Sequence, residues 1–419
     1  MRPRLRLLTL AVLAALAAGC AGRDRANPLD PANPSTGGRP VGFASLAGYA
    51  IVTLTWTPQP ALSIDGFRVL RLAPGDSLWR PLGPVSPATQ QGALDLTVSN
   101  GATYRYRLYY VIRGALANLP AEDQATPGPL RPWVADAGAG QLDQLTPDGR
   151  HVVSSATDAG GLQSLAVDPS TSRVWTSASL DGMVTVREPG GLFPVLITGL
   201  SQPFTLAVSP LDHGAWVCEL GGSLAHLAPD GSRLAPGEIP NLGLPTGVAV
   251  SPHDYSVWLC ENGGNSVRHY DSSGGKNGVV PLPLPSRVAV DSVSGRALVT
   301  SFNSGRVWLL SATTAAVTDS SSAASGPIGI AVDPRRGHVW VADALGNRVL
   351  VLDSATLAVL LTVPGISEPR DVDVDLATGE AWVVARGTEE ILRLSPTGQV
   401  LQRLGGFSDL AEVRLDPGL

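Results

Sequence analysis

The sequence has few charges, a single lysine and only three cysteines. Charged residues make up 16% of its 419 residues, well below the usual quarter. The 30 basic and 36 acidic residues give a net charge of −6, which leaves no surplus of positive charge for a nucleic-acid partner. Every basic residue except Lys276 is an arginine. DNA and RNA are therefore excluded as partners.

The composition also leaves little room for long helices. Glycine (47 residues) and proline (35 residues) together account for about a fifth of the chain and follow no collagen-like period, so turns must be frequent. Hydrophobic residues make up 44%, which is enough to form a buried core. We expect an all-β protein.

Only the N-terminus carries a long apolar run. Three arginines within the first six residues precede an apolar segment, residues 7–18. Gly19 and Cys20 follow it, giving the sequence Leu16-Ala17-Ala18-Gly19-Cys20. The run is too short for a permanent membrane span but fits a secretion signal. Residues 1–20 resemble a bacterial lipoprotein signal, although this family usually has Leu where Ala17 stands.

The resemblance implies that Cys20 is acylated and becomes the mature N-terminus, attached to a membrane through its lipid. The alternative is ordinary cleavage after Ala15-Leu16-Ala17, which would leave a soluble secreted protein. Both readings place the protein outside the cytoplasm. Residues 21–39 are rich in Pro, Asn, Asp and Gly, so we expect a disordered, extended tether there.

Residues 40–128 show the alternation of half-buried strands. Three strands are marked by apolar or aromatic residues at every second position: Val52, Leu54 and Trp56; Phe67 and Val69; Tyr104, Tyr106 and Leu108. Their order resembles a fibronectin type III domain, a spacer or adhesion module. This resemblance implies that Trp56 lies in the core and that the Tyr104 hydroxyl bonds to nearby backbone.

From residue 129 to 419 the chain repeats with a period of about 42 residues. Each unit contains a short apolar strand that ends at an acidic or hydroxyl residue: Asp168, Ser209, Ser251, Asp291, Asp333, Asp375 and Asp416. Seven residues after each of the first six stands Trp175, Trp216, Trp258, Leu298, Trp340 or Trp382. Trp133 has no such strand before it, and the strand ending at Asp416 has no Trp after it.

The two incomplete units complement each other. We therefore expect a closed ring of seven blades, in which residues 410–416 form the inner strand of the blade that also contains residues 132–155. Such closure leaves neither the first nor the last blade with an open edge.

The copy that begins at Pro327 resembles NHL and YVTN-type propeller repeats. The matching residues are Pro327, Ala331, Val332, Asp333, Trp340, Val341, Asp343, Asn347, Arg348 and Val349. The resemblance implies a scaffold for protein or ligand binding and fixes no activity.

Cysteines and histidines do not point to a reactive centre. Cys218 and Cys260 take matching positions in neighbouring units, where packed sheets are too far apart for a disulfide, so we expect two buried free thiols. The histidines complete no metal-ligand pattern, and we expect neither a metal nor a cofactor.

Two families of propeller enzymes offer further patterns for comparison. The family of virginiamycin B lyase would require a catalytic His near the channel, and propeller lactonases would require inward Glu, Asn and Asp. Neither pattern is evident in this sequence.

Four units carry an acidic residue three positions after the Trp, before a Gly-rich hairpin: Asp136, Glu219, Glu261 and Asp343. We expect these carboxylates to cap the N–H groups of the hairpin turns.

The inner strands supply the candidate site. Four residues before its last residue, each strand carries Ser164, Thr205, Gly247, Arg287, Gly329, Asp371 or Glu412, which we expect at the channel mouth. Two positions further on, five alanines are followed by Asp373 and Arg414. Because a lone buried charge is costly, we expect Asp373 and Arg414 to form an ion pair that joins the last two blades. We expect Arg287, Arg370, Asp371 and Glu412 to form a ligand-binding patch.

These features predict an exported, lipid-anchored, monomeric protein that binds or scaffolds a protein or small ligand without catalysis. The alternative is an enzyme of the lyase or lactonase type that acts at the channel mouth.

Overall fold

The computed structural model describes residues 27–189 and 193–417, and the chain divides into two units between Pro127 and Gly128. The expected signal segment and the lipidation of Cys20 lie outside the described residues. Within them, no helix is long and apolar enough to cross a membrane. The only helical element there is a 3-10 turn, η1 (Arg386–Thr388), so the protein is all-β, as its composition predicts.

The N-terminal unit contains two sheets around one core. The first consists of β1 (Ala44–Gly48), β2 (Ile51–Thr55) and β5 (Gly92–Asp95). The second consists of β3 (Gly66–Leu72), β4 (Arg80–Pro81), β6 (Tyr104–Ile112), β7 (Ala115–Leu116) and β8 (Ala121–Ala125). Alternate residues of both sheets, among them Leu54, Phe67 and Tyr106, meet in the core. The Tyr104 hydroxyl accepts a hydrogen bond from the Ser99 N–H (3.0 Å).

Residues 27–39 are not the extended tether that their composition predicts. They form successive tight turns, in which the Asn33 side chain accepts hydrogen bonds from the N–H groups of Ser35 and Thr36. The Thr36 hydroxyl donates to the Pro28 carbonyl, and Leu29 packs against the core of the N-terminal unit. Asn, Asp and Pro were interpreted as signs of disorder, but they are also the residues of tight turns.

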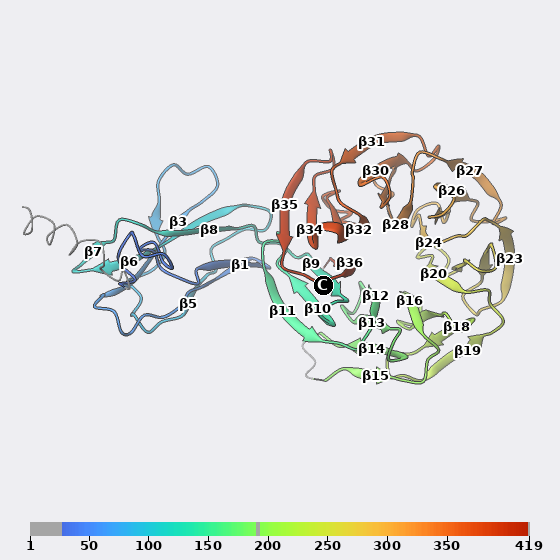
Figure 1. Ribbon diagram of the computed structural model, residues 1–419, viewed down its shortest axis with the longest axis horizontal. Coiled ribbons are helices and arrows are strands. Elements are labelled where there is room, and N and C mark those ends of the chain that lie inside the picture. Colours follow the sequence, from blue (N-terminus) through green and yellow to red (C-terminus); the bar gives the residue numbers. More distant parts are fainter. Residues whose placement is uncertain (1–26, 190–192, 418–419) are drawn as a thin grey trace, which may run out of the picture. The chain divides into compact units, whose positions relative to one another are not determined.

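The described part of the second unit consists of seven four-stranded antiparallel sheets arranged in a ring (Figure 1). The innermost strands are β36 (Leu410–Asp416), β12 (Leu162–Val167), β16 (Pro203–Val208), β20 (Pro245–Val250), β24 (Arg287–Val290), β28 (Pro327–Asp333) and β32 (Pro369–Val374). The second strands are β9 (Arg131–Asp136), β13 (Val174–Ala178), β17 (Ala215–Glu219), β21 (Val257–Glu261), β25 (Ala297–Ser301), β29 (His338–Asp343) and β33 (Ala381–Ala385).

The third strands are β10 (Gln141–Leu145), β14 (Met183–Arg187), β18 (Ser223–Leu227), β22 (Ser266–Tyr270), β26 (Arg306–Leu310), β30 (Arg348–Asp353) and β34 (Glu390–Leu394). The outer strands are β11 (Val152–Thr157), β15 (Val195–Ile197), β19 (Arg233–Ile239), β23 (Lys276–Pro281), β27 (Val317–Ser321), β31 (Val359–Pro364) and β35 (Val400–Gly405).

Burial follows the position of a strand in its sheet. Second strands such as β17 and β33 are buried at every residue, because each sheet packs between two neighbours. The repeated tryptophans on these strands, for example Trp175 and Trp340, are fully buried. Outer strands such as β11 are mostly exposed. The apolar runs of the sequence thus mark the strands that are covered on both faces.

The two ends of the ring share one sheet, as the incomplete units predict. Strand β36 pairs with β9, placing Val413 opposite Val134 and Arg414 opposite Trp133. The turn after β10 also contributes to the seam. Gly149 (φ +70°) lies so close to the Trp382 ring that an added Cβ would come within 2.6 Å of it. Glycine is therefore required at this turn for both its backbone conformation and its size.

The acidic residues at the ends of the second strands cap a different loop from the expected one. Asp343 accepts hydrogen bonds from the N–H groups of Ser325 and Gly326, in the loop that leads into β28. Glu219 and Glu261 accept from the corresponding loops before β16 and β20. Only Asp136 also caps its own hairpin, at the Ala139 N–H. The prediction of hairpin capping is thus correct for Asp136 alone, and the shared role is to fix the loop before an innermost strand.

Cys218 and Cys260 are buried and free, which confirms the prediction for these two residues. Burial raises the pKa of the Cys218 thiol to about 12 and that of Cys260 well above its ordinary value. Both thiols are therefore protonated and unreactive in the folded protein.

Candidate functional site

The innermost strands bring a cluster of charged residues to the axis of the ring. Ser164, Thr205, Arg287, Gly329, Asp371 and Glu412, all at the position predicted for the channel mouth, line a narrow cavity of about 50 Å³ together with Arg414. The strands approach closely where glycine occupies this position. A Cβ on Gly329 would lie 2.5 Å from the Asp371 Cα, and one on Gly247 would lie 2.7 Å from the Ser286 carbonyl oxygen.

Glu412 is the centre of this cluster. Its carboxylate, buried on β36, accepts hydrogen bonds from the Ser164 hydroxyl (2.8 Å) and the Leu165 N–H (3.0 Å) on β12. It also accepts from Nη2 of Arg287 (3.1 Å) and Nη2 of Arg414 (3.3 Å). One carboxylate therefore connects β36 to the sheets that begin with β12 and β24.

The expected ion pair between Asp373 and Arg414 is replaced by a different arrangement. The Arg414 guanidinium forms its ion pairs with Asp371 and Glu412. Asp373 instead accepts hydrogen bonds from the N–H groups of Leu415 (2.9 Å) and Val374 (2.8 Å). The buried Arg414 is paired with carboxylates, as expected, but its position in the sequence did not show which carboxylates its side chain reaches.

The electrostatics of the cluster follow from its burial. Burial raises the pKa of Asp371, and that of Asp373 to about 6, although the nearby Arg414 opposes both shifts. For Arg414, burial alone would lower the pKa, but the carboxylates of Asp371, Glu412 and Asp373 hold it above its ordinary value. Arg414 is therefore permanently charged, whereas Asp373 changes its charge just below neutral pH.

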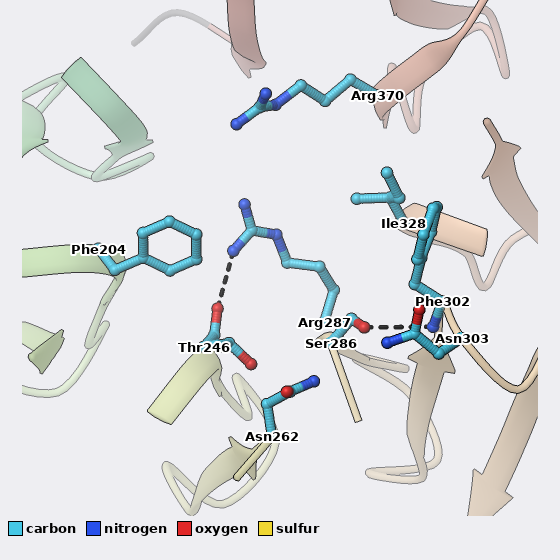
Figure 2. A pocket seen from close by; sticks show the side chains of 9 residues that line it. All are labelled: Phe204, Thr246, Asn262, Ser286, Arg287, Phe302, Asn303, Ile328 and Arg370. Carbon is cyan, nitrogen blue, oxygen red and sulfur yellow. Dashed lines mark hydrogen bonds between the residues drawn. The ribbon is translucent and has the colours of Figure 1, made fainter. Parts of the chain in front are cut away.

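A larger pocket of about 370 Å³ adjoins this cluster, and we call it the mouth pocket (Figure 2). Its lining residues are Phe204, Thr246, Asn262, Ser286, Arg287, Phe302, Asn303, Ile328 and Arg370. Arg287 lines both cavities. Its Nη1 donates to the Thr246 carbonyl (2.8 Å), and its guanidinium lies 5.4 Å from the centre of the Phe204 ring.

Arg370 is the exceptional residue of the mouth pocket. Its side chain extends from the start of β32 towards the same space as Arg287 (Figure 2), yet it donates a hydrogen bond to no residue in the described part of the chain. Burial lowers the pKa of Arg370, and the neighbouring charges of Arg287 and Arg386 lower it further. A second pocket of about 360 Å³ shares Arg370, Phe302 and Ile328 with the first.

The four residues of the predicted patch are thus divided between two cavities. Arg287 and Arg370 line the mouth pocket, whereas Asp371 and Glu412 lie in the narrow cavity. The mouth pocket also contains residues that the sequence analysis missed. Four of these, Phe204, Thr246, Ser286 and Ile328, stand like the predicted Arg370 five positions before the residue that ends their apolar strand. The repeat alignment, shifted by one residue, would have found them.

No histidine is among the residues that line the mouth pocket or the narrow cavity. His226 stacks on Trp216 and His269 on Trp258, each with ring centres 4.1 Å apart, in the interior of the sheets. Within residues 27–189 and 193–417, no group of three or more His, Cys, Asp or Glu side chains is arranged to hold a metal ion.

Comparison with known proteins supports the fold. No family model and no curated protein matches the chain. Among solved structures, it is similar to virginiamycin B lyase from Staphylococcus aureus (TM-score 0.51, 17% identity, 59% of this chain and 84% of that chain). It is also similar to a functionally unknown protein from Desulfotomaculum acetoxidans (TM-score 0.59, 14% identity, 69% and 99%). A third similar structure is a putative 6-phosphogluconolactonase from Bacteroides uniformis (TM-score 0.58, 14% identity, 68% and 99%). At these identities the likeness concerns the fold alone, and together with the ring of four-stranded sheets it identifies the second unit as a β-propeller.

Proposed function

We propose that this chain is an exported, lipid-anchored and monomeric binding protein, whose seven-bladed propeller takes up a small ligand in the mouth pocket. The apolar segment before Cys20 supports export and lipid attachment. The seven four-stranded sheets and the pairing of β36 with β9 support the number of blades. Two sheets around one core, with the Tyr104 hydroxyl bonded to the Ser99 N–H, support a fibronectin type III-like spacer before the propeller.

One observation carries the binding role. Two neighbouring arginines, one of them without a hydrogen-bond acceptor in the described chain, line a pocket of about 370 Å³ together with two phenylalanines and two asparagines. Pockets of this size, with a few convergent polar groups on an apolar wall, are typical of small-molecule sites. The rest of the charged cluster is paired within itself and serves to hold the ring together.

The alternative function is an enzyme of the lyase or lactonase type at the same mouth. It rests on the likeness of fold, and fold alone does not determine activity. The two proposals differ in what happens to a captured ligand: a binding protein releases it unchanged, and an enzyme converts it.

The test is capture of small molecules by residues 21–419, immobilised and incubated with an extract of the source cells. The bound fraction is eluted and identified by mass spectrometry. Ile328→Trp fills the pocket, whereas Val279→Trp places the same bulk on the exposed outer strand β23. We expect the wild type and Val279→Trp to retain the same compound and Ile328→Trp to lose it. Equal retention by all three would refute binding at the mouth, and recovery of a converted product would favour the enzyme.

A further inference from the structure

The arginines around the mouth pocket are not all paired. Three arginines gather at this end of the ring: Arg287, Arg370 and Arg414. Arg287 is paired with Glu412, and Arg414 with Asp371 and Glu412. Arg370 forms no ion pair within the described residues, and nearby Arg386 is itself paired with Asp409. One half-buried positive charge is therefore left without a partner.

A half-buried arginine without an ion pair can bind an oxyanion. A guanidinium removed from water loses hydrogen bonds that a carboxylate restores with matching, bidentate geometry. Burial and the charges of Arg287 and Arg386 lower the pKa of Arg370, and the smaller opposite effects of Glu412 and Asp409 do not compensate them. No carboxylate stands among the nine residues that line the mouth pocket.

The walls of the pocket define the remainder of the ligand. Figure 2 shows Phe204 on one side of the arginine pair, and Phe302 and Ile328 on the other. These side chains offer aromatic and aliphatic surface to a flat or apolar body. The side-chain amides of Asn262 and Asn303 add neutral polar groups to the lining.

We propose that the mouth pocket recognises a monocarboxylate with an aromatic or apolar body, and that Arg370 receives the carboxylate. The inference rests on the proposed function and specifies its ligand. A single charge is favoured over a phosphate dianion, because Arg287 is already paired with Glu412 and only Arg370 of the two pocket arginines is without an ion pair. Arg287 then acts as a fixed neighbour, held by Glu412 and the Thr246 carbonyl.

The experiment compares three probes by isothermal titration calorimetry: 3-phenylpropionate, its neutral amide 3-phenylpropionamide, and inorganic phosphate. We expect the carboxylate to bind with a Kd in the millimolar range, as is usual for so small a ligand, and at least about tenfold more tightly than the amide or phosphate. Arg370→Gln should weaken carboxylate binding by about tenfold and leave amide binding unchanged. Arg403→Gln, which removes an arginine from the outer strand β35, is the matched control and should bind like the wild type.

The outcomes separate this inference from the proposed function. Equal binding of carboxylate and amide, or unchanged carboxylate binding by Arg370→Gln, would overturn the monocarboxylate assignment but leave the pocket as a binding site. A preference for phosphate would overturn it as well. The assignment also fails if none of the probes binds at up to about 20 mM, and ligand capture blocked by Ile328→Trp would then still support the proposed function. Circular dichroism of each variant checks that loss of binding is not loss of fold.

Discussion

Glu412 shows how one buried carboxylate can hold several strands. It receives hydrogen bonds from the Ser164 hydroxyl and the Leu165 N–H, and from the guanidinium groups of Arg287 and Arg414. A buried ion pair adds little to stability when compared with a well-packed apolar group, but the loss of one partner leaves the others charged and desolvated. Removal of Glu412 should therefore lower the free energy of unfolding more than removal of an ordinary surface carboxylate.

We expect Glu412→Ala to lower the free energy of unfolding by about 3–5 kcal/mol, because Arg287 and Arg414 lose a buried partner. Glu390→Ala, which breaks the more exposed ion pair with Arg403 on the outer strand, should cost less than about 1 kcal/mol. Urea denaturation of the three proteins measures the difference. Similar values for the two variants would show that the cluster does not hold the ring.

Asp373 makes stability depend on pH. Its pKa is about 6 in the folded protein, because it is buried, against an ordinary value of 3.8. Between these values the folded state binds more protons than the unfolded state, so the contribution of Asp373 to stability falls as pH rises from about 4 to about 6. Asp373→Asn removes this dependence while keeping an oxygen for the Leu415 N–H.

The stability of Asp373→Asn relative to the wild type should therefore increase between about pH 4 and pH 7, by no more than about 3 kcal/mol. Urea denaturation at several pH values gives this difference. Asp319→Asn, on the exposed part of β27, provides the control for the loss of one carboxylate. A difference for Asp373→Asn that does not change with pH would show that its carboxyl group has the same pKa in both states.

At the scale of elements, the recurring device is a carboxylate at the end of a second strand that fixes the loop before an innermost strand. Asp343 accepts from the N–H groups of Ser325 and Gly326 and from Nε of Arg348. Its residue spacing correctly indicated a capping role but not the capped loop. The loop lies 17–18 positions earlier in the chain, and it comes beside the carboxylate only when the sheet has formed.

Asp343→Ala leaves two backbone N–H groups and Nε of Arg348 without their acceptor, so we expect the free energy of unfolding to fall by about 2–4 kcal/mol. Asp353→Ala removes hydrogen bonds of an exposed turn and should lower the free energy of unfolding much less than Asp343→Ala. Hydrogen exchange should also accelerate at the Gly326 amide of Asp343→Ala. An unchanged rate at this amide would mean that other contacts fix the loop.

At the scale of the whole molecule, the sequence repeat predicted the arrangement of the strands, whereas the contacts of individual side chains could not be predicted. The period of about 42 residues and the two incomplete units correctly predicted that β36 joins β9. They also indicated which residues gather at the mouth, because equivalent positions in a ring face the same axis. The partners of each side chain were not predictable in this way. Arg414 forms ion pairs with Asp371 and Glu412, and Asp373 accepts a hydrogen bond from the backbone of β36.

The predicted patch likewise combined residues of the mouth pocket and of the narrow cavity, although these differ by one position in the repeat alignment. Adjacent residues such as Arg370 and Asp371 line different cavities. An irregularity in the pairing of β32 with β33 falls between Pro369 and Asp371 and interrupts the regular alternation of side chains. The composition of residues 27–39 led to the wrong expectation of an extended tether. Turn-forming residues are common both in an ordered series of turns and in a disordered linker, so composition does not distinguish the two.

The central claim is that the two ends of the propeller share one sheet and so place Glu412 and Arg414 at the mouth. Hydrogen–deuterium exchange of the intact chain, followed by mass spectrometry, tests it most directly. Residues 410–416 should exchange as slowly as the equivalent innermost strand at residues 327–333, because both pair with a buried second strand. Exchange of residues 410–416 as fast as that of the exposed turn at residues 74–78 would contradict the closure of the ring.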